Sequence, residues 1–90
     1  MQYNLENKKV LITGASGGIG KELCKKFLDN GSKLICTSSI SDKIDDLKKL
    51  FGTNNYYYIL DLLNKDSVTN NIKIIADEHK DIDILINNAG

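Results

Sequence analysis

Short apolar runs alternate along this chain with stretches in which apolar residues recur every three or four positions. Short apolar runs predict four strands, at residues 9–13, 33–38, 56–60 and 82–87. The first run is continuously apolar, which is typical of a central parallel strand covered on both faces. Between the runs, apolar residues recur every three or four positions and predict helices over residues 18–30, over residues 41–51 and after Asn64.

Each predicted helix has an apolar stripe and a start or stop signal. Ser41 or Asp42 can cap the second helix and Asn64 the third, while Asn30-Gly31 and Gly52 end the first two. The expected buried stripes are Ile19, Leu23 and Phe27 with Cys24 and Leu28 beside them, then Ile44, Leu47, Leu50 and Phe51, and finally Val68, Ile72, Ile75 and Ala76.

The β-α-β-α-β-α-β alternation predicts an α/β fold, in which a parallel sheet has helices on both faces. Right-handed crossovers give the strand order 3-2-1-4, the first half of a doubly wound, Rossmann-type sheet. Its switch point lies between the first and fourth strands. The first two helices are expected on one face and the third on the other. The tyrosines at 56–58 then lie on an edge strand with their hydroxyls toward water, and no binding role is assigned to them.

Four glycines join the first strand to the first helix. Residues 13–20 read Thr-Gly-Ala-Ser-Gly-Gly-Ile-Gly. A strand that turns into a helix through glycines presents backbone N–H groups at the positive end of the helix dipole, and this geometry suits a phosphate. Because the turn falls at the carboxyl end of the first strand, beside the switch point, it favours a dinucleotide-binding role.

Composition narrows the range of functions. The 90 residues have a formal net charge of zero without a basic cluster, which argues against nucleic-acid binding. No apolar run approaches the roughly 20 residues of a membrane span. The polar N-terminus lacks the apolar segment of a signal peptide, so a cytoplasmic location without membrane contact is expected. Cys24 and Cys36 lack metal or redox spacing and are expected to be reduced core thiols. His79 is expected to be a solvated helix residue, and no metal site is predicted.

Three motifs together resemble one family. Residues 13–20 match the Thr-Gly-x-x-x-Gly-x-Gly turn of the short-chain dehydrogenase/reductase family. Residues 87–90 match its Asn-Asn-Ala-Gly, and Asp61 stands where the family has an acidic residue after the third strand. Bacterial 3-oxoacyl-(acyl-carrier-protein) reductases look most similar. The resemblance identifies residues 1–90 as the N-terminal part of a single NAD(P)-binding Rossmann domain.

The glycine turn alone leaves the branch of the family open. Glycines 14, 17 and 20 also satisfy the Gly-x-x-Gly-x-x-Gly turn of the extended branch, which contains sugar-nucleotide epimerases and dehydratases. The Asn-Asn-Ala-Gly motif at 87–90 resembles the classical branch instead, and it decides the interpretation.

The resemblance implies a cofactor-binding role for each matching position. Groups at the turn would line the pyrophosphate and the adenosine ribose: Gly14, Ser16, Gly17, Gly18, Ile19 and Gly20. Asp61 would accept a hydrogen bond from the adenine amino group, with Leu62 packed near the ring. The plainer alternative for Asp61 is a turn or capping residue. Asn88, Ala89 and Gly90 would border the ribose on the nicotinamide side.

The end of the second strand bears on the choice between NADP and NAD. An NAD site usually has Asp or Glu about 20 residues past the turn, where the carboxylate binds the ribose 2′-hydroxyl. This chain has Ser38 and Ser39 there. The missing carboxylate favours NADP (NADPH), with its 2′-phosphate against these two serines, and makes NAD the lesser candidate. Many NADP enzymes of the family carry Arg at the position of Gly17 or after the second strand; this chain has no Arg, and Lys43 is a candidate substitute.

The resemblance also implies an activity. Family chemistry uses a Ser, a Tyr-x-x-x-Lys pair and a further Asn, all beyond the Asn-Asn-Ala-Gly motif. No catalytic residue is therefore assigned here, and the ninety residues alone are expected to be inactive. The expected parent is a homo-oligomeric, NADP-dependent oxidoreductase of fatty acid synthesis. It is expected to reduce a 3-oxoacyl thioester to a 3-hydroxyacyl thioester, and its substrate is expected to be a small molecule or bound to an acyl carrier. Two alternatives stay open: a non-catalytic dinucleotide-binding or sensor module, and a short-chain dehydrogenase for a small alcohol, ketone or sugar.

Overall fold

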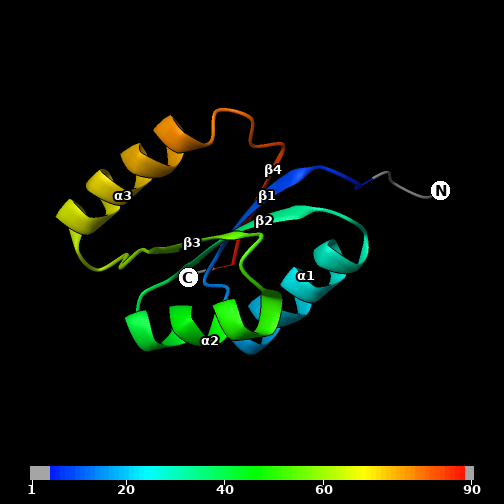
Figure 1. The fold of residues 1–90 in the computed structure, drawn as a ribbon. Helices are drawn as coiled ribbons and strands as arrows, with labels where there is room; N and C mark the ends of the chain where they lie inside the picture. Colours follow the sequence, from blue (N-terminus) through cyan, green and yellow to red (C-terminus); the bar gives the residue numbers. More distant parts are fainter. Residues whose placement is uncertain (1–4, 89–90) are drawn as a thin grey trace.

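Strands and helices alternate along the whole of the computed structural model, which describes residues 5–88 (Figure 1). The elements are β1 (Lys9–Thr13), α1 (Gly18–Asp29), β2 (Lys33–Ser38), α2 (Ser41–Phe51), β3 (Tyr56–Ile59), α3 (Lys65–Glu78) and β4 (Ile84–Asn87). β4 begins later than predicted because the Asp83 carboxylate, in place of a main-chain carbonyl, accepts the Lys9 N–H at 2.9 Å. No helix within residues 5–88 has the length and apolar character needed to cross a membrane.

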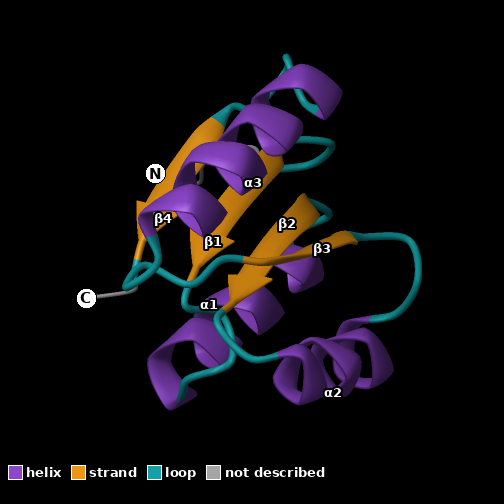
Figure 2. Cartoon of the chain, turned by 90° about the vertical axis from the view of Figure 1, so that its left-hand side faces the viewer, coloured by secondary structure: helices purple, strands orange, loops and turns teal. Residues whose placement is uncertain are grey.

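The four strands form one parallel sheet in the order β3-β2-β1-β4. This order is the predicted one. Figure 2 shows α3 over one face of the sheet and α1 with α2 over the other. Thr13 at the end of β1 is level with Asn87 at the end of β4. The chain therefore leaves both strands side by side, and this edge is the switch point of the fold.

The core lies between the sheet and the helices α1 and α2. Its buried side chains are Val10, Ile12, Ala15, Cys24, Leu34, Cys36, Ile44 and Leu47. Cys24 and Cys36 are free thiols with their sulfur atoms 3.8 Å apart, which confirms the predicted core thiols. The contact with Cys24, together with burial, raises the pKa of Cys36. Leu50 is 59% exposed, contrary to the predicted stripe, because it stands roughly 120° around the helix from Ile44.

The opposite face of the sheet is covered less closely. Ile75 is the buried residue of α3, whereas Ile72 is 51% exposed. Both line a cavity of about 360 Å³ between α3 and the sheet, together with Leu11 of β1 and Leu85 of β4. The stripe of α3 therefore faces the sheet as predicted, but the helix does not close onto it, so most of the stripe stays partly exposed.

The helix ends follow the predicted signals with one exception. The Asn64 side chain caps α3 by accepting the Ser67 N–H at 3.1 Å. Gly31 and Gly52 follow α1 and α2 with φ angles of 85° and 87°, the left-handed region that favours glycine. The predicted cap of α2 at Ser41 or Asp42 is wrong. Ile40 is the N-cap and makes no side-chain cap hydrogen bond, since its extended backbone already places Ser41 inside the helix.

The environment of His79 also differs from the prediction. The residue is 4% exposed and its Nε2 lies 2.7 Å from the Tyr58 hydroxyl. The neighbouring Tyr57 hydroxyl donates to the Gly52 carbonyl at 2.7 Å. The hydroxyls of Tyr57 and Tyr58 were expected to face water, but both form hydrogen bonds within the protein. The reason is that the end of α3 lies within reach of Tyr58 and the end of α2 within reach of Tyr57, although Tyr56 and Ile59 of the same strand remain 42% and 43% exposed.

Candidate functional site

The glycine turn at residues 14–20 is built on close backbone contacts. Gly14 has a φ of 63°, in the left-handed region. A Cβ atom at Gly20 would lie 2.4 Å from the Gly14 carbonyl oxygen and 2.8 Å from the Ala15 Cα, so only glycine fits there. At Gly18 a Cβ would meet nothing within 4 Å. The first turn of α1 therefore packs directly onto the end of β1 through Gly20, while Gly18 faces open space.

The N-terminus of α1 has no protein anion of its own. Its N-cap is Gly17, which makes no side-chain cap hydrogen bond, and the first turn holds no acidic residue. The main-chain N–H of Lys21 donates to the Gly17 carbonyl at 2.9 Å. The main-chain N–H groups that precede Lys21 in the helix are therefore directed out of its end. Together with the positive helix dipole, this arrangement fits an anionic group such as a phosphate.

Hydrogen bonds from both neighbouring strands fix the turn. The Ala15 N–H donates to the Thr37 carbonyl of β2 at 2.9 Å. From the other side, the Asn88 side-chain amide donates to the Gly14 carbonyl at 3.1 Å. Asn88 also donates its main-chain N–H to the Thr13 hydroxyl at 3.1 Å. Sequence reasoning gave Asn88 a ribose contact and missed this positioning role; the pairing of β1 with β4 was the signal that could have found it.

A cavity of about 290 Å³ opens beside the turn. Its lining residues are Gly14, Ser16, Ser39, Leu60, Asp61, Leu62 and Leu63. Most of them are predicted cofactor contacts, and they come from the ends of three strands. The structure thus brings together the glycine turn, the end of β2 and the segment after β3. The larger cavity under α3 is lined mostly by apolar side chains, with Thr13, Thr37 and Asn87 as its polar residues, so the smaller one is the better candidate for a polar ligand.

Ser38 and Ser39 have different surroundings. Ser38 is 2% exposed, and its hydroxyl lies 2.9 Å from the Ser16 hydroxyl. Ser39 is exposed and lines the cavity. Ser38 therefore joins β2 to the glycine turn, and Ser39 is the serine whose hydroxyl is accessible to a ligand.

Asp61 makes a turn and also lines the cavity. One carboxylate oxygen accepts the Leu63 N–H at 3.0 Å, the local bond of an Asx turn. This contact orients the carboxylate and places Leu62 and Leu63, which are 48% and 98% exposed. The turn interpretation and the ligand interpretation of Asp61 are compatible, because a carboxylate has a second acceptor oxygen.

Six predicted positions in the described part of the chain do not line this cavity: Gly17, Gly18, Ile19, Gly20, Ser38 and Asn88. Gly20, Ser38 and Asn88 hold the glycine turn in place. Gly18 and Ile19 are exposed at the start of α1. Ile19 is 71% exposed, so its predicted place in the buried stripe of this helix is wrong, because the first turn of α1 projects beyond the end of the sheet. Gly17, just before them, is the N-cap. Ala89 and Gly90 lie outside the described residues.

An open parallel sheet with an uncapped, glycine-rich helix start at its switch point defines the class of dinucleotide-binding α/β domains. The family model for short chain dehydrogenases matches residues 8–90, and the chain belongs to this family. The structure is similar to a solved short chain dehydrogenase from Bacillus anthracis, with a TM-score of 0.79 and 30% sequence identity. That match covers 96% of this chain and 36% of the other.

Curated relatives include two kinds of reductase or dehydrogenase. The chain is 41% identical over 86 residues to the 3-oxoacyl-[acyl-carrier-protein] reductase FabG of Buchnera aphidicola subsp. Schizaphis graminum, covering 96% of this chain and 35% of the relative. It is 36% identical over 81 residues to the NADP-dependent 3-hydroxy acid dehydrogenase YdfG of Escherichia coli K12, a match that covers 90% of this chain and 33% of the relative. The chain spans about a third of the length of these relatives.

Proposed function

We propose that this chain is the cofactor-binding part of an NADP-dependent oxidoreductase that reduces 3-oxoacyl thioesters to 3-hydroxyacyl thioesters. The observation that carries the proposal is the cavity in which Gly14, Ser39 and Asp61 meet beside the uncapped start of α1. The family supports the oxidoreductase class. The substrate class is supported by the name of the FabG relative, and the cofactor by the name of the YdfG relative.

Each part of the cofactor has a matching part of the site. The N–H groups of Gly18, Ile19 and Gly20 would hold the pyrophosphate, because they begin a helix whose N-terminus has no side-chain cap. Asp61 would accept from the adenine amino group, with Leu62 against the ring. Asn88, with Ala89 and Gly90, would border the nicotinamide ribose. When bound, the reduced nicotinamide supplies a hydride.

The choice of NADP follows from the end of β2. Ser39 would donate its hydroxyl to the 2′-phosphate, and Ser38, buried against Ser16, would hold this loop in place. No carboxylate lines the cavity on this side, so nothing there repels a phosphate dianion; Asp61 lies across it, after β3.

The test is a competition titration of the full-length protein with NADPH and NADH. We expect tighter binding of NADPH, and a reversed preference in Ser39→Asp, because a carboxylate repels the 2′-phosphate and can accept from a 2′-hydroxyl. Thr69→Asp, at an exposed position of α3 away from the cavity, adds the same charge and should change neither affinity. A wild-type protein that binds NADH more tightly would overturn the cofactor assignment.

Activity separates the enzyme from a sensor module. We expect the full-length protein to oxidise NADPH in the presence of a 3-oxoacyl thioester. Tight NADPH binding without turnover of any 3-oxoacyl thioester would contradict the proposed reaction and favour a non-catalytic module. Turnover with a small ketone alone would change the substrate class.

A further inference from the structure

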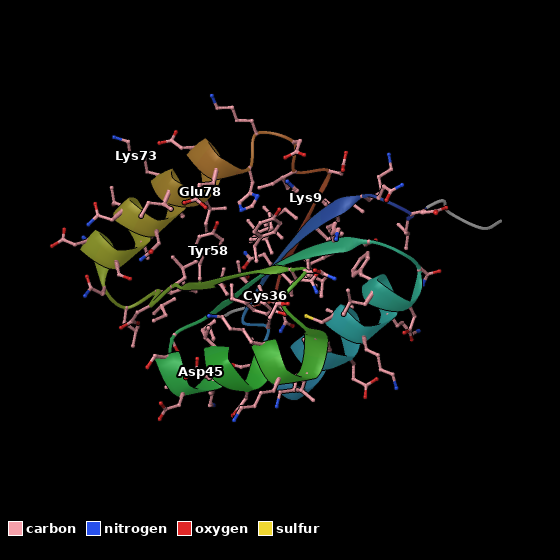
Figure 3. The ribbon with its side chains drawn as sticks, in the orientation of Figure 1. Lys9, Cys36, Asp45, Tyr58, Lys73 and Glu78 are labelled. Atoms are coloured by element: carbon pink, nitrogen blue, oxygen red, sulfur yellow. The ribbon has the colours of Figure 1, made fainter. Side chains whose placement is uncertain are left out.

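A second cluster of polar side chains lies around the start of β1 and the end of α3, and the hydroxyl of Tyr58 in β3 reaches it. Lys9 of β1, Tyr58 of β3, and Glu78 and His79 at the end of α3 are joined by hydrogen bonds; we name these four residues the His79 latch. Figure 3 shows Lys9, Tyr58 and Glu78 gathered between α3 and the sheet. The latch connects the helix to two strands.

The chemistry of the partners fixes the direction of each bond. The Lys9 ammonium, 3.4 Å from His79 Nδ1, can only donate, so Nδ1 is the acceptor. His79 is then neutral with its proton on Nε2, and it donates to the Tyr58 oxygen at 2.7 Å. The Tyr58 hydroxyl is left to donate to the Glu78 carboxylate. The complete chain of bonds therefore requires a neutral imidazole.

The latch is one of the few close contacts that hold α3 to the sheet within the described residues. Ile75 is the buried residue of the helix itself. His79, whose N–H donates to the Ile75 carbonyl at 2.8 Å, adds a second buried side chain directly after the helix. The cavity of about 360 Å³ separates much of the remaining apolar stripe from the sheet. Loss of the His79 contacts would leave the end of α3 held mainly through Ile75.

Protonation at Nδ1 would oppose the arrangement in two ways. It removes the acceptor for Lys9, and it places a second positive charge beside the ammonium in a buried position. The carboxylates of Glu78 and Asp81 favour the protonated imidazole. Asp81, however, is exposed and already paired with Lys9 at 2.8 Å. The ring of Tyr56 packs edge-on against the imidazole, with the two ring centroids 4.4 Å apart. Burial first, and Lys9 second, lower the pKa of His79, and the two carboxylates only partly oppose them.

We propose that the His79 latch is a pH-sensitive fastening of α3, closed while the imidazole is neutral and opened by its protonation. Opening loosens the C-terminal half of α3 over its cavity. A histidine whose folded pKa lies below the free value stabilises the fold above the free pKa of about 6.5. That stabilisation is lost as the pH falls from this value toward the folded pKa.

The first test is an NMR titration of the imidazole in the full protein chain. His79 is the only histidine among the 90 residues, and in the full-length protein its ¹⁵N signals are assigned by their absence from His79→Gln. These signals report both its tautomer and its pKa. We expect the Nε2–H tautomer at neutral pH and a midpoint below about 6.5. A mixed tautomer with an unshifted midpoint would overturn the proposal.

The second test follows amide hydrogen exchange, corrected for intrinsic rates, between pH 7.5 and pH 5.5. We expect protection in α3 to fall more than protection in α1, by at most about tenfold, because pH 5.5 lies about one unit below the free histidine pKa and each unit is a factor of ten. In His79→Gln, which cannot titrate, the excess loss should vanish. Equal losses in both helices of the wild-type protein would contradict the latch.

Two lysine variants keep the proposal testable if His79→Gln does not fold. Lys9→Gln removes the facing ammonium, so the titration midpoint of His79 should move to higher pH. Lys8→Gln removes the same charge from the exposed neighbouring residue and should leave the midpoint nearly unchanged. An identical effect of the two variants would show that the Lys9 contact does not hold the imidazole neutral.

Discussion

Gly18 and Gly20 stand two residues apart at the start of α1 but have different surroundings. The backbone of Gly14 and Ala15 approaches Gly20 so closely that no side chain fits, whereas Gly18 faces open space. The close approach lets the helix start directly over the end of β1, and this sets the direction of its N–H groups. At the scale of single residues, the glycine turn thus has two structural glycines, Gly14 with its positive φ angle and Gly20, and two exposed ones, Gly17 and Gly18.

Gly20→Ala should destabilise the fold, while Gly18→Ala should not. The new Cβ of the first variant meets backbone atoms that cannot move aside, and overpacking of this kind costs about 1–3 kcal/mol. The matched Gly18→Ala variant should stay within about 0.5 kcal/mol of the wild type. Urea unfolding of the two proteins measures the difference. Equal stability would mean that the contact of Gly20 with Gly14 is not tight in solution.

At the scale of elements, the three helices begin in different ways. α3 has a side-chain cap from Asn64, α2 begins at Ile40 without one, and α1 begins at Gly17 without one. The lack of a side-chain cap serves ligand binding only in α1, because the N–H groups at its start face the proposed pyrophosphate site. In α2 it leaves donors unpaired beside an isoleucine that is 48% exposed.

Cap substitutions should therefore change stability in opposite directions. Asn64→Ala should lower the free energy of unfolding by about 1 kcal/mol, because the Ser67 N–H loses its acceptor. Ile40→Ser should raise it by up to about 1 kcal/mol, since a hydroxyl at the N-cap can accept from the first turn of α2. Urea unfolding midpoints at pH 7.5 measure both changes in the free energy of unfolding. A loss of stability in Ile40→Ser would show that its exposed side chain packs against something in solution.

Much of the element scale was predictable from the sequence, and the exceptions have physical causes. Strand order and helix faces follow from local apolar periodicity and the handedness of crossovers, which the sequence displays directly. The surroundings of His79 and Ile72 depend on how far one element stands from another, and periodicity carries no information on that distance. Leu50 is exposed for a different reason, because it stands roughly 120° around the helix from Ile44. The same limit applies to Ser38 and Ser39: both fit a polar contact on the sequence, and only packing shows that Ser38 is buried against Ser16.

At the scale of the whole molecule, the two ends of the parallel sheet have separate roles. The carboxyl ends of the strands gather the glycine turn, Ser39, Asp61 and Asn88 into the proposed cofactor site. The His79 latch joins Lys9 at the amino end of β1 and Tyr58 of β3 to the end of α3. α3 spans the distance between them, because Asn64 begins it close to the cofactor cavity and His79 follows its last turn.

The most direct test is hydrogen–deuterium exchange of the full-length protein with and without NADPH. If the glycine turn holds the pyrophosphate, saturating NADPH should protect the amides of residues 14–20 and 60–63 most strongly. The outer surface of α2 and the amino ends of the strands should change little. Bound NADPH that leaves residues 14–20 unprotected, or that protects the cavity under α3 instead, would contradict the assignment of this turn as the cofactor site.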